Sequence, residues 1–164
     1  MPLLDSVVTY LGTTGGSNLG LTIGHNLCKV PFPEDPTAVA DAAVCVIEYP
    51  GREATYAHGT ASQGAPVFEF PRFQVIVRDT LNNFETARKL AQDIYLKLEF
   101  LNETTLSGTR YAMIRAQGPP FPMATMRGSA DDENSRTRFV CNYEATKERG
   151  LRSITSMSAP PPSL

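Results

Sequence analysis

The sequence predicts an α+β protein with a mixed, mostly antiparallel sheet, helices packed on one face of that sheet, and extended loops or hairpin arms. Segments in which apolar and polar residues alternate, as they do in half-buried strands, lie both before and after a strongly amphipathic helix. The strands therefore do not alternate strictly with helices, as they do in parallel doubly wound sheets.

Length and composition favour a single domain. The 164 residues are 41% hydrophobic and 20% charged, which suffices for one core. We expect this domain to span residues 1–149, because residues 150–164 lack a core pattern, end in a proline run and predict a flexible tail. The formal net charge of −2 gives no general attraction to nucleic acid or to anionic membranes. The sequence predicts neither a signal peptide nor a membrane span, and hence no membrane partner.

The first third of the chain predicts one helix and one buried strand. Residues 3–11 place apolar side chains at helical spacing and are followed by Gly12, so they predict a short helix. Residues 21–36 predict irregular or short-strand structure. The β-branched, apolar residues 43–49 predict a strand that ends at a turn signal, Pro50-Gly51, and residues 52–66 predict a long exposed loop.

The middle of the chain predicts a strand and then a long helix. Residues 69–79 alternate, with Phe73, Val75 and Val77 on one face and the polar residues on the other. The following helix is capped by Asn82 and carries an apolar stripe that pins it to the sheet. This stripe consists of Phe84, Ala87, Ala91, Ile94, Leu98 and Leu101.

Two further strands are predicted, over residues 109–117 and 136–146. Between them, three prolines in residues 118–122 argue against ordinary sheet structure, since proline lacks the N–H that a strand ladder needs. Residues 119–135 therefore predict a turn with a projecting hairpin or arm.

The sequence predicts no enzyme, cofactor or metal. Its two histidines lie in loop-like segments, no GxSxG motif is present, and its cysteines lie in apolar runs where reduced, unreactive thiols are expected in a cytoplasmic product. His25 and Cys28 form an HxxC motif without a second ligand pair. Asp131, Asp132 and Glu133 are three consecutive acids, which are more often a solvated charge run than a cation site.

Arginines in and beside the predicted strands are the candidate functional residues. Individually, each reads as part of the solvent face of a half-exposed sheet. Together they suit a subunit interface of complementary charge, because guanidinium groups fix the register between partners. The interface candidates are Arg72, Arg78, Arg115, Arg136 and Arg138.

Four segments carry a family resemblance. In this order, "PRFQVIVRD", "ETARKLAQDIYLKL", "GTRYAMIRAQGPPFPM" and "DENSRTRFVCNYEA" together resemble the minor capsid or tail terminator family of tailed bacteriophages. The resemblance covers roughly residues 1–148, and Ser135 stands where the family pattern often has glycine.

The resemblance implies a function in the virion. Tail terminators of long-tailed, siphovirus-type phages form a hexameric ring on the tail tube, stop its polymerisation and present a surface for head-tail joining. The implied partners are further copies of the chain, the tail tube protein and head-tail connector proteins, with DNA only passing through the lumen. The protein would be assembled in the host cytoplasm and reside in the virion, at the neck of the tail.

The resemblance also gives roles to particular residues. The strand bearing Arg72 and Arg78 would face a neighbouring subunit or help to build the sheet of the ring. Reversing these charges would then disrupt ring or tube binding and leave the monomer folded. Residues 52–66 and 119–135 would contact the tube or the head, and Asp131, Asp132 and Glu133 would line the lumen or make loop contacts. The alternatives are another neck protein, such as a head completion protein or connector adaptor, or a small non-viral binding domain or enzyme.

Overall fold

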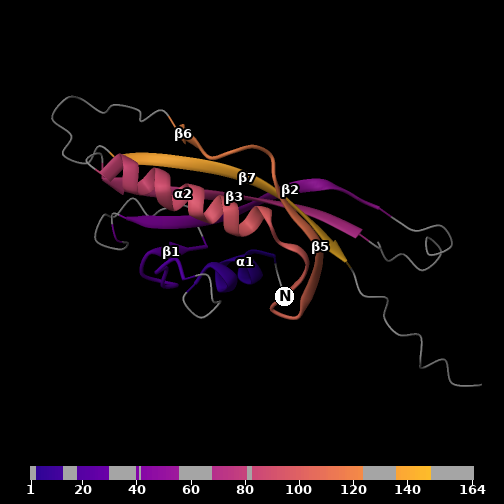
Figure 1. Cartoon of the computed structure of the whole chain (residues 1–164). Helices are drawn as coiled ribbons and strands as arrows, with labels where there is room; N and C mark the ends of the chain where they lie inside the picture. Colours follow the sequence, from indigo (N-terminus) through magenta and orange to yellow (C-terminus); the bar gives the residue numbers. More distant parts are fainter. Residues whose placement is uncertain are drawn as a thin grey trace, which may run out of the picture.

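The structure is a computed structural model that describes residues 3–12, 18–29, 40, 42–55, 68–80, 83–123 and 136–148. Within these residues, seven strands form one mixed sheet in the order β1-β2-β3-β7-β5-β4, with β6 also paired to β7. Only the β1–β2 pair is parallel among these strands. Figure 1 shows α2 lying across the strands β3 and β7, and buried residues of both helices join one core with the sheet. The predicted fold class is confirmed.

The N-terminal elements form where the sequence predicts them. Helix α1 spans Leu3–Leu11 and buries its apolar stripe, including Val7, Val8 and Leu11. Gly12 donates its N–H to the Val8 carbonyl at 2.9 Å and ends the helix. The short strand β1, Leu27–Cys28, pairs with the start of β2.

Strand β2 is longer than predicted, because it continues through Pro50-Gly51. It spans Ala43–Thr55 and pairs with β3, with shifts of register between Tyr49 and Arg52 and between Arg52 and Thr55. The predicted turn at Pro50-Gly51 is wrong, because both residues belong to β2. A Cβ on Gly51 would lie 1.9 Å from the Phe70 carbonyl oxygen, so the glycine allows β2 and β3 to approach closely. Residues 52–55 of the predicted loop thus belong to β2, and the rest of that loop lies outside the described residues.

Strands β3 and β7 form the centre of the sheet and confirm the two predicted strands. Strand β3 spans Phe68–Thr80 and β7 spans Arg136–Glu148, in an antiparallel register that runs the full length of both. Most of the inward-facing residues are buried, and the Phe73 and Tyr143 rings stack with centroids 4.9 Å apart.

Helix α2 spans Phe84–Glu99 and buries four members of the predicted stripe, Ala87, Ala91, Ile94 and Leu98. The predicted cap, Asn82, lies outside the described residues. Asn83 holds the N-cap position without a side-chain capping hydrogen bond, and its amide donates to Asp79 Oδ1 at 3.2 Å instead. The helix ends before Leu101, which is partly buried against the core.

The strands after α2 include two that were not predicted. Strand β4, Asn102–Leu106, forms a hairpin with β5, Thr109–Ala116. The positive φ angles of Ser107 and Gly108, 48° and 78°, provide the tight turn between them.

Strand β6, Phe121–Met123, corrects the prediction that prolines bar this segment from the sheet. Pro122 is paired with Phe139 of β7. It is tolerated because β6 has no second neighbour among the described strands, and prolines are accepted at sheet edges. Residues 124–135 lie outside the described residues, as does the predicted tail over residues 150–164. Neither described helix is long and apolar enough to cross a membrane.

Gly51 provides a test of the extended β2 strand. We expect Gly51→Ala to lower the free energy of unfolding by about 2 kcal/mol or more, because overpacking forces backbone shifts. Gly118→Ala is the matched control, since a Cβ there has no atom within 4 Å. Urea unfolding of both variants measures the difference, and equal stability of the two variants would contradict the close approach of β2 and β3.

Candidate functional site

The face of the sheet opposite α1 and α2, here called the outer face, carries several charged residues of the central strands, among them Arg72 and Glu144. Because side chains alternate along a strand, Arg72, Gln74 and Ile76 point away from the buried Phe73, Val75 and Val77. Each of these three outer residues lies opposite an outer residue of β7: the partners are Glu144, Asn142 and Val140. Gln74 Nε2 donates to Asn142 Oδ1 at 2.8 Å, which pins the register on this face.

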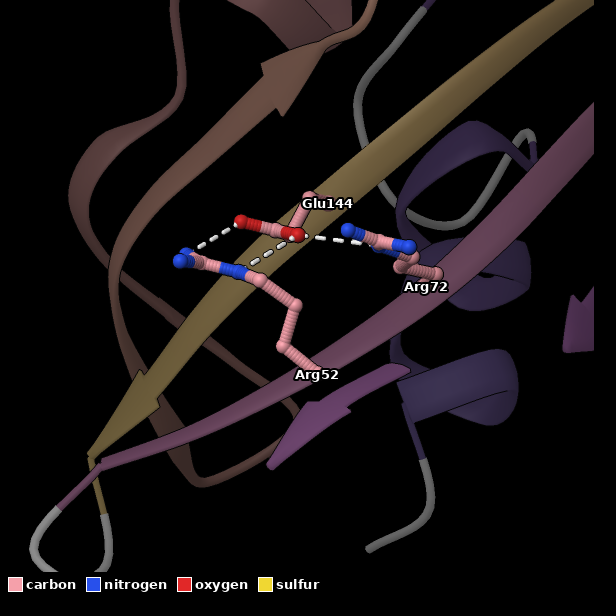
Figure 2. Close-up of polar contacts among 3 residues, drawn as sticks. All are labelled: Arg52, Arg72 and Glu144. Atoms are coloured by element: carbon pink, nitrogen blue, oxygen red, sulfur yellow. Dashed lines mark hydrogen bonds and ion pairs between the residues drawn. The ribbon is translucent and has the colours of Figure 1, made fainter. Parts of the chain in front are cut away.

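Glu144 lies between two guanidinium groups on the outer face (Figure 2). Arg52 donates to it through Nε at 3.0 Å and Nη2 at 2.6 Å, and Arg72 donates through Nε at 2.9 Å. The Arg52 guanidinium also lies 4.4 Å from the centre of the Phe70 ring, a cation–π contact. These three residues, Glu144, Arg52 and Arg72, are called the Glu144 cluster.

The irregularity in β2 brings Arg52 into this cluster. Regular alternation from Tyr49, which lies opposite Arg72, would turn Arg52 to the inner face. The register shift between Tyr49 and Arg52 places Arg52 opposite Phe70 and on the outer face. The cluster therefore joins three strands, β2, β3 and β7.

The two arginines keep Glu144 ionised. Partial burial raises the pKa of the Glu144 carboxyl, but the hydrogen bonds and positive charges of Arg52 and Arg72 outweigh burial and hold the pKa below the ordinary glutamate value. The carboxylate thus stays charged at neutral pH and orients both guanidinium groups.

The five predicted interface arginines are not gathered at one place. Arg72 belongs to the Glu144 cluster, and the exposed Arg115 lies opposite Glu144 on the other side of β7. Arg138 and Arg78 face each other nearer the start of β7, and Arg136 precedes them there. Arg138 is exposed and Arg136 is intermediate in exposure.

Arg78 occupies the predicted face of its strand but is not at the surface. Its side chain is 2% exposed and donates through Nη2 to the Ala40 carbonyl at 3.1 Å. A charge reversal there would bury a carboxylate and destabilise the subunit. The expectation that such a variant stays folded is therefore corrected for Arg78.

Two members of the Glu144 cluster were not predicted from the sequence as functional residues. Arg52 fell in a predicted loop, and Glu144 stood on the polar face of a predicted strand without a role. Their association follows from the register of three strands, which no local motif in the sequence encodes. Asp131, Asp132 and Glu133 lie outside the described residues.

No catalytic arrangement accompanies the cluster in the described part of the chain. A shallow hollow of about 450 Å³ lies beside α2, lined by Asn18, Leu19, Asp93, Leu96 and Lys97, which include no nucleophile paired with a base. No three potential metal ligands of the described residues come together. None of the three cysteines, all of which are described, forms a disulfide, and burial raises the pKa of Cys45 to about 12.

The Glu144 cluster predicts a pH-dependent contribution to stability. A carboxyl with a lowered folded-state pKa stabilises the protein above its unfolded-state pKa of about 4.3, and this contribution is lost as pH falls through the folded-state pKa. We expect Glu144→Gln to lower the free energy of unfolding by roughly 1 kcal/mol at neutral pH, and its difference from wild type to shrink in acid. Urea unfolding across this pH range measures it, with the exposed Glu53→Gln as control. A difference that persists unchanged in acid would contradict the charged contact.

Comparisons with solved structures find chains that are similar to this one. One solved chain, from the virion of a native gene transfer agent particle, is 15% identical and aligns over 91% of this chain and 87% of its own, with a TM-score of 0.44. A second solved chain is 11% identical over 90% of this chain and 96% of its own, and its TM-score of 0.52 indicates a shared fold. None of the curated proteins matches this chain.

The match to a family model covers most of the chain. The model of the bacteriophage tail terminator protein matches residues 16–149, which include every described strand. The chain therefore belongs to the bacteriophage tail terminator protein family, whose members are structural proteins of the virion and not enzymes, as the sequence predicts.

Proposed function

We propose that this chain forms a ring, most simply a hexamer, that caps the tail tube of a long-tailed, siphovirus-type phage. The ring stops further polymerisation of tube subunits and provides the surface for head-tail joining. The observation that carries this proposal is the family match over residues 16–149. Its partners are further copies of the chain, the tail tube protein and the head-tail connector proteins.

The proposed mechanism is steric. One side of the ring copies the contact that the last tube subunits make with each other, and the opposite side offers no place for another tube subunit. Such a ring closes through a heterologous contact, in which two different surfaces of the same subunit meet. The arginines at the surface of the outer face, Arg72, Arg115 and Arg138, support this role, because guanidinium groups recognise carboxylates with defined geometry.

The remaining candidates have secondary roles in the proposal. Arg136 borders the outer face at the start of β7, and the buried Arg78 supports the strand that carries Arg72. Residues 52–66 and 119–135, which include the end of β2 and all of β6, contribute contacts to the tube or to the head. DNA only passes through the lumen, near which acidic residues would prevent its retention. Assembly takes place in the host cytoplasm, and the finished protein lies at the neck of the tail.

Electron microscopy of lysates from a phage that lacks this chain tests the proposal. We expect overlong, headless tails beside filled heads, because tube polymerisation would continue without a cap. Supplying the wild-type chain from a plasmid is the control and should restore tails of uniform length joined to heads. Tails of normal length that fail to join heads would overturn length control and make the chain another neck protein, such as a connector adaptor.

A further inference from the structure

We infer that the Glu144 cluster and Arg115 bind the acidic run Asp131-Asp132-Glu133 of a second copy of this chain. The inference rests on the proposed function in one respect, since it requires copies of the chain to associate. It assigns the two surfaces that meet in the heterologous contact of the ring.

The arginines in and beside the Glu144 cluster carry more positive charge than Glu144 neutralises. Arg52 and Arg72 share one carboxylate, and Arg115 lies opposite that carboxylate across the next strand pair. Two guanidinium groups thus contact one glutamate and a third arginine is paired with it across the strands, which leaves a surplus of positive charge. A guanidinium has five N–H donors, and the contact with Glu144 uses only the Nε donor of Arg72.

These groups can be reached by a partner. The side chain of Arg52 is 55% exposed and that of Arg72 is 30% exposed, and Arg115 is exposed. Glu144 and the Phe70 ring hold Arg52 in place, so its ordering requires no partner. A preorganised guanidinium loses less conformational entropy when it binds a carboxylate.

The chain itself provides the complementary charge. Its formal net charge is −2, although the outer face has this local surplus of arginines. The sequence has one run of three consecutive acidic residues, at positions 131–133. A dense anionic segment of this kind is opposite in charge to the surplus of arginines, and complementary potentials of this sort define which surfaces pair.

Chain length favours contact with a second copy over contact within one copy. Glu133 precedes Arg136, the first residue of β7, by three residues, so their Cα atoms can be at most about 11 Å apart. Arg136 and Glu144 are eight residues apart along β7, a distance of about 26 Å. Chain length therefore keeps Glu133 away from the cluster of its own copy, and a neighbouring copy can present the acidic run to that cluster.

Charge reversal of each surface tests the pairing. We expect Arg115→Glu and Asp132→Arg each to weaken self-association of the full chain about tenfold at low salt, and the double variant to recover most of this loss. Sedimentation equilibrium measures the association, and circular dichroism verifies that each variant is folded. Arg88→Glu, the same charge change on α2, is the matched control and should leave the association unchanged.

The outcomes of this cycle are distinct. Additive effects without recovery in the double variant would overturn the inference. A second pair of results would also overturn it. If Asp132→Arg self-associates as wild type does and Arg115→Glu binds a non-specific DNA duplex more weakly, the arginines face DNA and not a second copy. Loss of the effects at high salt would agree with an exposed charge pairing.

Cross-linking in assembled tails provides a second measurement if the purified variants are all monomeric. The double variant Arg115→Cys with Asp132→Cys should form disulfide-linked multimers on oxidation, and the pair Arg88→Cys with Asp132→Cys should not. Absence of multimers in tails that contain the variant would overturn the inference. If the phage that lacks the chain has tails of normal length, only the proposed capping function is refuted. The contact between copies is tested separately, by the charge-reversal and cross-linking experiments.

Discussion

The pairing of β3 with β7 is the constraint on which the rest of the structure depends. These strands are separated by more than fifty residues of sequence, yet they pair along their full length, and β2, β5 and β6 add to their free edges. Because side chains alternate with a period of two, a slip of one residue would move Phe73, Val75 and Val77 to the outer face. The stacked Phe73 and Tyr143 rings oppose such a slip from the inner face, and the Gln74–Asn142 hydrogen bond opposes it from the outer face.

This register divides the subunit into two sides with different chemistry. The inner face is closed by α1 and α2, whose apolar stripes complete the core. The outer face keeps Glu144, Arg52, Arg72 and Arg115 near solvent, whereas Arg78 is buried. The alternation that buries the core places Arg72 and Glu144 on this face, and the register shift in β2 adds Arg52. Packing and recognition thus have a common origin in the order of residues along β3 and β7.

Local patterns in the sequence predict the elements that have strong periodicity. Helix α1, the stripe of α2 and the alternating strands β3, β5 and β7 are confirmed, and so is the fold class. The continuation of β2 through Pro50-Gly51 was missed, because a bulge beside Phe70 and a turn have the same local signal. Strand β6 was missed because proline is excluded only from strands paired on both edges, and strand order is a long-range property. For the same reason, the sequence identified Arg72 but could not bring it together with Arg52 and Glu144, whose contact depends on register.

The prolines in and just before β6 have a consequence for strand addition at this border of the sheet. An edge strand normally offers a row of N–H and C=O groups onto which another chain can add a strand. Pro119, Pro120 and Pro122 remove donors from the segment that follows β5, and β6 is only three residues long. This border of the sheet is therefore a poor template for strand addition. An incoming strand would find few N–H donors along β6, so open-ended growth of the sheet from this border is disfavoured.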